Sequence, residues 1–212
     1  MNPIADIRKD YKLRSFSETD AAQDPYIQFT NWFNEAIESN IDEVNAMTLA
    51  TADAHGKPSA RIVLLKGITE KGFEFYTNYE SHKAKEMAAN SKVALVFFWK
   101  ELERQVRIEG TVAKAPAEIS DEYFMSRPFE SRVGAWSSPQ SSIITSREIL
   151  EENVESNKKK FENEEMTRPI FWGGYIVIPT LFEFWQGRSS RLHDRIEYVE
   201  NNNEWIKRRL AP

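Results

Sequence analysis

Apolar residues recur along this chain with two different periods, one typical of helices and the other of strands. Asp24 and Pro25 can begin a helix as its N-cap and first residue, and apolar side chains follow at helical spacing to about Asn40. Further helices are predicted where a cap or a proline precedes spaced apolar positions, at 81–89, 116–127, 131–136 and 146–161. Residues 116–163 therefore form a predicted helical insertion.

Short segments rich in β-branched and aromatic residues alternate with turns elsewhere, which is typical of strands. They cover residues 46–52, 61–66, 73–77, 93–99, 105–113, 174–178, 182–186, 192–199 and 204–210. The segment 61–66 is predicted to be a core strand, and 93–99 to be buried on both faces, because their centres are continuously apolar. Successive antiparallel strands with tight turns predict a mainly β (α+β) fold, an antiparallel barrel that is closed or nearly closed, with inserted helices.

The first 23 residues are polar and mixed in charge, which predicts a mobile N-terminal arm over 1–23. The rest, 24–212, is predicted to be one domain. A net charge of -5 argues against a nucleic-acid partner, so any basic site must be local. The chain has no cysteine, no signal-peptide pattern and no apolar run near the roughly 18 residues that span a membrane. We therefore expect a cytoplasmic protein without a membrane partner.

Several kinds of site have no support in the sequence. None of the eight glycines forms a phosphate-binding loop motif. The histidines, His55, His82 and His193, lack metal-ligand spacing, so no metal is expected. A nucleophile elbow for a hydrolase triad is also missing. A phosphorylated ligand would therefore have to be neutralised by side-chain cations.

Residues 185–195 concentrate such cations in an acidic chain. The segment contains three arginines and His193, and Trp185 opens it. Arginine forks bind planar anions and a tryptophan offers a flat apolar face, which together suit an aromatic, phosphorylated ligand. A solvated basic turn explains the same composition equally well.

Other candidate cations lie at strand ends and helix starts. Arg61 and Lys66 are five residues apart and would point to opposite faces of an ideal strand, so they could serve two anions, or one could be a surface charge. Lys83 lies in the first turn of the predicted helix 81–89, where the helix dipole disfavours a lysine unless an anion is bound.

Polar residues of the predicted helical insertion could add to such a site. Tyr123, Arg127 and Ser131 recur every four residues, and because Pro128 interrupts the helix we expect them to converge across a helix–turn. A loop after Pro139 offers the amide and hydroxyl groups of residues 140–142.

Together these segments resemble the pyridoxamine 5'-phosphate oxidase family, whose members have the FMN-binding split-barrel fold. The matching motifs are RIVLLKG at 61–67, FYTNYESHKAKE at 75–86, ELERQVRIEG at 101–110, YFMSRPFESRVGAWSSPQS at 123–141, FWGGY at 171–175 and EFWQGRSSRLHDR at 183–195, running on to the terminal RLAP. The resemblance covers nearly the whole chain from about residue 24, and the motifs in this order are specific as a set.

The resemblance implies a homodimer with two FMN sites at the subunit interface. The residues that would bind FMN are Arg61, Ile62, Val63, Leu64, Leu65, Lys66, Tyr76, Thr77, His82, Lys83, Gln105, Gln140, Ser141, Trp185 and Arg195. Those that would bind substrate are Lys66, Tyr123, Arg127, Ser131, Arg191, Leu192 and His193, with Arg8 and Tyr11 from an arm that folds over the occupied site. Arg191 and His193 would be catalytic, whereas Arg188, Ser189 and Ser190 match no functional position.

The implied reaction oxidises pyridoxamine 5'-phosphate and pyridoxine 5'-phosphate to pyridoxal 5'-phosphate, with molecular oxygen as acceptor and hydrogen peroxide as product. Two alternatives stay open. Another split-barrel flavin oxidoreductase would lack the phosphate cluster of Lys66, Tyr123, Arg127 and Ser131. A non-catalytic carrier of FMN or pyridoxal 5'-phosphate would tolerate the loss of Arg191 and His193.

One residue departs from the family pattern. Arginine usually follows the serine at position 81, and this chain has His82 there. Histidine is only partly charged near neutral pH, whereas arginine is always charged. FMN affinity is therefore predicted to weaken between about pH 6 and 8 more than in an arginine-bearing relative.

Overall fold

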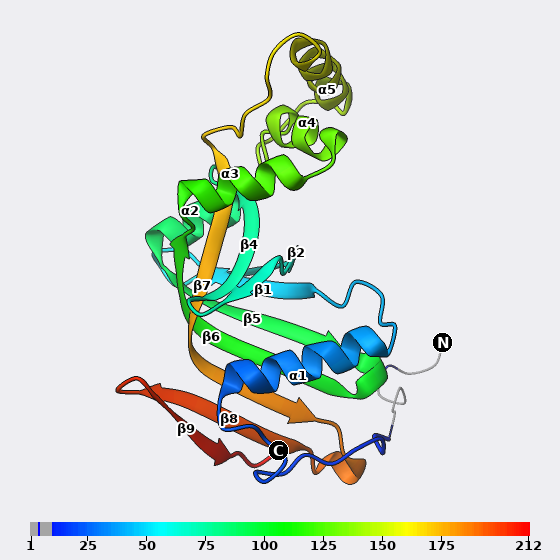
Figure 1. Cartoon of the computed structure of the whole chain (residues 1–212), viewed down its shortest axis with the longest axis vertical. Helices are drawn as coiled ribbons and strands as arrows, with labels where there is room; N and C mark the ends of the chain where they lie inside the picture. The colour runs from blue at the N-terminus through cyan, green and yellow to red at the C-terminus, as the bar shows by residue number, and fades with distance from the viewer. Residues whose placement is uncertain (1–3, 5–9) are drawn as a thin grey trace. The chain divides into compact units, whose positions relative to one another are not determined.

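The computed structural model describes residue 4 and residues 10–212 (Figure 1). The chain divides into two compact units. Unit 1 comprises residues 1–49, 94–110 and 179–212, and unit 2 comprises residues 50–93 and 111–178. Four strands contribute residues to both units: β1 (Ala46–Ala52), β5 (Lys92–Trp99), β6 (Arg104–Lys114) and β7 (Trp172–Gln186).

Hydrogen bonds join nine strands of the described chain into one sheet. The order is β2-β1-β5-β6-β7-β4-β3, with β8 paired to β7 and β9 paired to β8. The remaining strands are β2 (Pro58–Leu64), β3 (Gly67–Thr69), β4 (Gly72–Asn78), β8 (Asp194–Asn201) and β9 (Glu204–Arg209). This path is open, with β2 and β3 at its ends. The predicted antiparallel, mainly β fold with inserted helices is confirmed, in its split form.

The α-helices of the described chain are α1 (Pro25–Glu38), α2 (His82–Ala89), α3 (Ala117–Ser126), α4 (Phe129–Ser137) and α5 (Glu148–Phe161). The first three begin directly after the predicted residues Asp24, Ser81 and Pro116, whereas α4 begins two residues before and α5 two residues after the predicted start, and neither of these two has a side-chain cap. Asp24 accepts hydrogen bonds from the backbone N–H groups of Tyr26 and Ile27 at 2.7 and 3.1 Å. The Ser81 hydroxyl accepts one from Ala84 at 3.4 Å. In the part of the chain that is described, none of these helices combines the length and the apolar character needed to cross a bilayer.

Aromatic side chains fill the core of unit 1. Trp32 of α1 meets Phe184 edge to face at 5.3 Å between ring centroids. Phe16, from the predicted N-terminal arm, is only 4% exposed and lies 4.9 Å from Trp32. The mobility of this arm stays a prediction, and its candidate residue Arg8 lies outside the described residues.

A smaller apolar cluster in unit 2 supports the helical insertion. Its buried members, Phe124, Val133, Met166 and Trp172, come from α3, α4, the loop after α5 and the start of β7. Strands β4 and β7 pair antiparallel beside it, with Phe75 opposite Tyr175 and Asn78 opposite Trp172. The helices of the insertion are thereby packed against the end of the β4–β7 pair where Asn78 lies opposite Trp172.

Three details of the predicted strands are wrong. Strand β2 alternates exposed and half-buried side chains, and Ile62 is 64% exposed, so it is not a core strand of this chain. Strand β5 buries alternate side chains and exposes Phe98, so it is not covered on both faces. The segments 174–178 and 182–186 belong to one strand, β7, which continues through Pro179. An apolar run shows that a strand can be covered, but not whether its own chain covers it.

Candidate functional site

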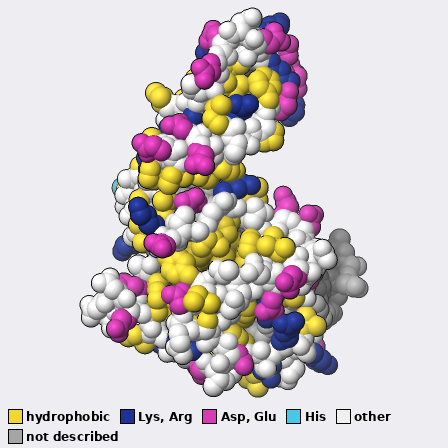
Figure 2. Space-filling model, viewed as in Figure 1, with side chains coloured by type: hydrophobic (Ala, Val, Ile, Leu, Met, Phe, Trp, Pro, Cys, Tyr) yellow, Lys and Arg dark blue, Asp and Glu magenta, His cyan; other side chains and the backbone are white. Residues whose placement is uncertain are grey.

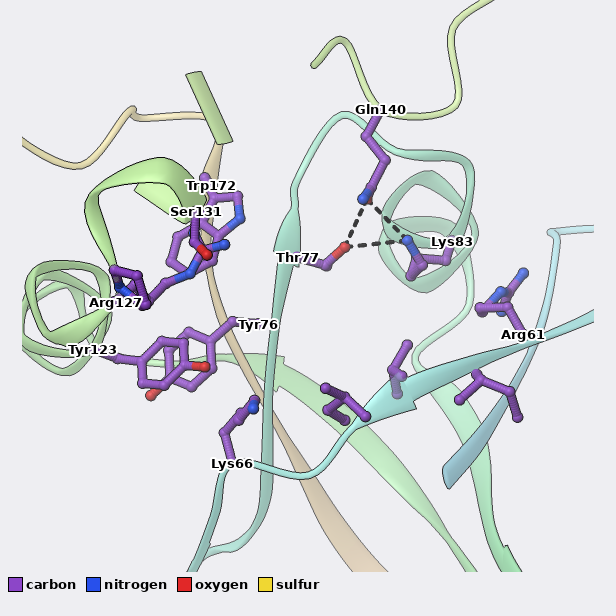
Figure 3. Close-up of a pocket in the computed structure, with 14 residues that line it drawn as sticks. Arg61, Lys66, Tyr76, Thr77, Lys83, Tyr123, Arg127, Ser131, Gln140 and Trp172 are labelled. Atoms are coloured by element: carbon purple, nitrogen blue, oxygen red, sulfur yellow. Dashed lines mark hydrogen bonds between the residues drawn. The ribbon is translucent and has the colours of Figure 1, made fainter. Parts of the chain in front are cut away.

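A cavity of about 550 Å³ opens in unit 2 (Figure 3). Its lining contains most of the predicted site residues of this unit: Arg61, Ile62, Val63, Leu64, Lys66, Tyr76, Thr77, Lys83, Tyr123, Arg127, Ser131 and Gln140. Pro128 and Trp172 complete the lining and were not predicted. Positive and negative side chains are interspersed on the face seen in Figure 2, so the gathering of cations in the cavity is a local feature.

One side of the cavity is built on α2 and β4, to the right in Figure 3. Lys83 Nζ donates to Thr77 Oγ1 at 3.1 Å and to Gln140 Oε1 at 3.0 Å, and the Thr77 hydroxyl donates to the same amide oxygen at 2.9 Å. Burial, with a further contribution from the positive charge of Arg61, lowers the pKa of Lys83. Among the described residues, no carboxylate forms an ion pair with Lys83. A partly desolvated cation of this kind suits an anionic ligand.

Arg61 is held beside Lys83 by a buried carboxylate that the sequence did not indicate. Its Nη2 lies 3.2 Å from Oε2 of Glu86, and its guanidinium also donates to the Thr51 and Ser59 hydroxyls. Desolvation opposes ionisation of Glu86, but hydrogen bonds from Ser59 and Thr51 and the nearby cations lower its pKa to about 2. Glu86 therefore stays ionised near neutral pH and fixes the Arg61 guanidinium. In the sequence, the role of Glu86 is indicated only by its position four residues after His82.

The opposite side of the cavity is built on the turn between α3 and α4, to the left in Figure 3. Tyr123 lies in the last turn of α3, Arg127 is its C-cap, and Ser131 lies in the first turn of α4. The predicted convergence across the interrupting Pro128 is confirmed, because all three side chains line the cavity. Nη1 of Arg127 is buried and has no hydrogen-bond partner within the described chain. This buried donor fits an anionic ligand.

Lys66 and Arg61 line the same cavity, so they do not point to opposite faces of a strand as predicted. The alternation fails because β2 ends at Leu64, before Lys66. Figure 3 places Lys66 near the Tyr76 and Tyr123 rings and Arg61 at the far side. The cavity thus presents two separate groups of cations.

Aromatic rings occupy the space between the α3–α4 turn and β4. The Tyr76 and Tyr123 rings are stacked, with centroids 3.8 Å apart and an angle of 20° between planes. Burial raises the pKa of both phenols, so both are neutral near pH 7. Trp172 lies beside them, and the FWGGY motif that contains it was the available sequence signal.

Three predicted residues of unit 2 do not line the cavity. Leu65 is buried in the core, and Ser141 is exposed on the loop. His82 is exposed on α2, and its Nε2 lies 3.0 Å from Oε1 of Glu86. His82 therefore reaches the cavity indirectly, through the carboxylate that also holds Arg61.

Further predicted residues lie in unit 1. The Trp185 and His193 rings are 4.6 Å apart, and Tyr11 meets both edge-on at 5.7 and 5.9 Å. His193 Nδ1 accepts the backbone N–H of Arg188 at 3.1 Å, so the neutral imidazole carries its proton on Nε2. Burial and the charge of Arg191 lower the pKa of His193, which favours this neutral form. The backbone N–H of Arg188 therefore orients a candidate catalytic residue, although no role was predicted for this position.

The remaining candidates of unit 1 are Arg195, Arg191, Leu192 and Gln105. Arg195 Nε donates to Oε1 of the buried Glu183 at 2.8 Å, and Arg107 donates to the other oxygen of that carboxylate. Arg191 and Leu192 are exposed, and Gln105 is half-buried on β6. Arg191 adopts a φ of 62°, a left-handed conformation that non-glycine residues adopt at a cost.

The fold and the cavity together define a class of protein. It is a split-barrel protein whose cavity can hold two anionic groups and flat rings, with side-chain cations in place of a glycine-rich loop.

Comparisons with known proteins place the chain within that class. Residues 33–159 match the family described as "Pyridoxamine 5'-phosphate oxidase", and residues 172–212 match "Pyridoxine 5'-phosphate oxidase C-terminal dimerisation region". The chain is 54% identical to the pyridoxine/pyridoxamine 5'-phosphate oxidase of Cyanothece sp., covering 99% of this chain and 98% of that protein. It is 55% identical to the protein of the same name from Leptospira interrogans, covering 100% of both. The chain belongs to the pyridoxamine 5'-phosphate oxidase family.

Solved structures agree on the fold. PhzG from Burkholderia lata, in complex with tetrahydrophenazine-1-carboxylic acid, matches with a TM-score of 0.89 and 25% identity over 96% of this chain and all of that one. A pyridoxamine 5'-phosphate oxidase-related, FMN-binding protein from Nostoc punctiforme matches with a TM-score of 0.70 and 15% identity, over 90% of this chain and 100% of that one.

Proposed function

We propose that this protein uses FMN to oxidise pyridoxamine 5'-phosphate and pyridoxine 5'-phosphate to pyridoxal 5'-phosphate, with molecular oxygen as the electron acceptor. The observation that carries the proposal is one cavity with cations on two opposite sides. Such a cavity suits two phosphorylated ring compounds held together. Relatives that are 54% and 55% identical over the full chain bear the name of this oxidase, which supports the proposal.

The side of the cavity built on α2 fits the phosphate and ribityl chain of FMN. Arg61 and Lys83 supply two positive charges, and Gln140 and Thr77 supply hydrogen-bonding groups. Lys83 has no carboxylate partner in the described chain, so an incoming phosphate would not have to displace one. FMN held there would supply the two-electron redox chemistry between the substrate and molecular oxygen. The predicted flavin contacts from Gln105, Trp185 and Arg195 are part of this proposal.

The side built on the α3–α4 turn fits the phosphate of the substrate. Lys66 and Arg127 provide charge, and Tyr123 and Ser131 provide hydroxyl groups. This phosphate does not react, so its binding serves to hold C4' of the pyridine ring in place. Substrates without the phosphate should therefore bind poorly.

His193 and Arg191 are the proposed catalytic residues. Neutral His193 presents a donor at Nε2, and Arg191 is always protonated in water, so it orients the substrate and does not act as the base. Oxidation of the alcohol removes one hydrogen from C4' and one from its hydroxyl group, and reduces oxygen to hydrogen peroxide. Oxidation of the amine also consumes water and releases ammonia.

The assembly proposed is a homodimer with FMN at the subunit interface. The match of residues 172–212 to a dimerisation region supports it, as do the exposed apolar side chains of Ile62 and Leu64 on β2. Closure of the arm that carries Tyr11, a single domain over 24–212 and a cytoplasmic location stay predictions.

An assay with three substrates tests the proposed activity. Purified protein is loaded with FMN and mixed with pyridoxamine 5'-phosphate, pyridoxine 5'-phosphate or unphosphorylated pyridoxamine, and oxygen uptake and aldehyde formation are recorded. We expect turnover of both phosphorylated compounds and far weaker turnover of pyridoxamine. A yellow protein that consumes no oxygen with any of them would be a carrier. Flavin reduction by a nicotinamide alone would indicate another oxidoreductase.

A further inference from the structure

Trp172, at the start of β7, forms a flat wall of the cavity beside the α3–α4 turn. Its ring lies nearly parallel to those of Tyr123 and Tyr76, at 5° and 16°, with centroids 6.2 and 5.7 Å away. The side chain is 7% exposed and still lines the cavity (Figure 3). A large aromatic residue here therefore contacts the site while being held by the protein around it.

The contacts behind Trp172 keep its ring in place. Phe124 meets the Trp172 ring edge-on at 5.4 Å between centroids. The backbone of Trp172 pairs with Asn78 in the β4–β7 ladder. Its carbonyl oxygen accepts a hydrogen bond from Arg168 Nη1 at 2.6 Å. A ring packed in this way is a fixed surface against which a mobile side chain can rest.

Arg127 rests on that surface. Its guanidinium carbon lies 4.6 Å from the centroid of the Trp172 ring, within the range of a cation–π contact. No carboxylate in the described chain forms an ion pair with Arg127. Burial lowers its pKa, yet an arginine remains protonated near neutral pH. The aromatic face therefore takes the place of a countercharge.

This way of holding an arginine differs in its consequence from an ion pair. A carboxylate would use the N–H donors of the guanidinium and cancel its charge. A stacked ring contacts only the flat face of the guanidinium and leaves the donors at its edge available. Nη1 of Arg127, buried and without a partner among the described residues, is such a donor.

We infer that Trp172 is the positioning residue for the substrate's phosphate, through Arg127 and the stacked Tyr123. The inference rests on the proposed function, since it names the residue that prepares the phosphate site of that reaction. It assigns Trp172 to the binding of the phosphate and not to the binding of FMN or to the chemical step.

Two variants of graded character test this inference. Trp172→Leu keeps an apolar side chain but removes the ring face, and we expect the KM for pyridoxamine 5'-phosphate to rise roughly tenfold. Trp172→Phe keeps a smaller ring, and we expect a rise of about twofold to threefold. In both variants, kcat and the dissociation constant of FMN, measured by flavin fluorescence, should stay within about twofold of wild type.

Two controls separate a positioning role from a general loss of stability. Trp136→Leu removes another tryptophan that packs against the same apolar cluster but does not line the cavity, and the KM should not change. The KM for unphosphorylated pyridoxamine should be nearly the same in Trp172→Leu and wild type, because no phosphate is involved.

Calorimetric titration with pyridoxal 5'-phosphate provides a readout that needs no turnover. Its affinity should fall in the order wild type, Trp172→Phe, Trp172→Leu, even if the protein proved not to be an oxidase. The inference is overturned if both variants bind it as wild type does, or if KM rises equally for both amines. If Trp172→Leu does not fold, an unchanged KM and affinity in Trp172→Phe overturn the inference. Failure of wild type to oxidise either phosphorylated compound rejects the proposed function separately.

Discussion

His193 has its two ring nitrogens in different environments. Nδ1 accepts the backbone N–H of Arg188, so only Nε2 can donate while the ring is neutral. Arg191 lies two residues earlier and disfavours a second positive charge, and burial acts in the same direction on the pKa. The neutral ring, with its proton on Nε2, is therefore the state available to a substrate near pH 7.

This protonation state predicts a pH profile. A lowered pKa keeps His193 neutral down through its ordinary value of 6.5, so kcat should stay constant from about pH 8 to that value and fall only below it. Protonation would then put a charge on Nδ1 and break the hydrogen bond from Arg188. His193→Ala should lower kcat roughly tenfold or more, with a smaller change in KM. Steady-state kinetics from pH 5 to 8 check both, and an unchanged kcat with a raised KM would exclude the catalytic role.

His82 contacts, through Glu86, the side of the cavity that is proposed to hold the FMN phosphate. The Glu86 carboxylate is shared between His82 Nε2 at 3.0 Å and Arg61 Nη2 at 3.2 Å. A protonated His82 satisfies part of the negative charge of Glu86 and leaves more of the Arg61 charge for a phosphate. A neutral His82 does not. The departure from arginine at this position therefore bears on the charge around Arg61 without placing the imidazole in the cavity.

FMN affinity should consequently weaken between pH 6 and 8. The expected loss is roughly twofold to fivefold, the range of an exposed ion pair. His82→Arg should remove most of it, because arginine is charged throughout this range. Titration of apo-protein with FMN at pH 6 and at pH 8 measures this loss of affinity in wild type and in His82→Arg. Lys83, whose pKa is lowered, is present in both proteins, so its titration cancels in the comparison. If FMN affinity has the same pH dependence in His82→Arg and wild type, this explanation is wrong.

At the scale of single elements, local chemistry made the helices predictable. The Asp24 and Ser81 caps act within a few residues of themselves, and so does Pro128, which ends one helix and caps the next. The coverage of a strand depends on distant residues. Ile62 lies in an apolar run, yet it is 64% exposed in the chain, and nothing in its neighbours along the sequence states that.

The cavity residues were predictable to different degrees for the same reason. Arg61, Lys83 and Arg127 are charges in unusual local positions, so they stood out in the sequence. Glu86 and Trp172 look like an ordinary helix carboxylate and an ordinary core aromatic. Their roles come from the guanidinium groups that pack against them, at 3.2 and 4.6 Å, and these contacts join residues 25 and 45 positions apart. Such contacts become visible only in the fold.

The proposed role of the α3–α4 turn in binding the substrate phosphate is tested by substituting Arg127. Arg127→Met should raise the KM for pyridoxamine 5'-phosphate by roughly tenfold to a hundredfold, the value of one or two charge-assisted hydrogen bonds. The change in kcat should be smaller, because the phosphate does not react. Arg132→Met is a matched control, since Arg132 lies on α4 close to the same turn but does not line the cavity. Equal effects of the two substitutions would show that the turn needs arginine for folding only.

At the scale of the whole molecule, the candidate residues fall into two sets. The cavity with Arg127 belongs to unit 2, while Trp185, His193 and Arg195 belong to unit 1. We predict that in the proposed homodimer a complete site takes one set from each subunit. The exposed β2 side chains and the match of residues 172–212 to a dimerisation region support the dimer on which this prediction depends.

A mixed dimer tests whether sites are shared. Arg127→Met and His193→Ala chains are co-expressed with different affinity tags, and the dimer that carries both tags is isolated. If each site combines two subunits, one site of the mixed dimer has both substitutions and the other has neither. With pyridoxamine 5'-phosphate kept well below the raised KM of Arg127→Met, its activity should then be about half that of wild type, although each homodimer retains roughly a tenth or less. Sites built from one chain would each carry one substitution, and the activity would stay at the level of the homodimers.

A second mixed dimer controls for the exchange itself. Arg132→Met paired with His193→Ala leaves one intact site under either arrangement, because Arg132 does not line the cavity. It should therefore show about half of the wild-type activity in both cases. If this control recovers activity and the Arg127→Met pair does not, the shared site is rejected while the dimer itself is not. If both recover, the cavity of one subunit is completed by His193 of the other.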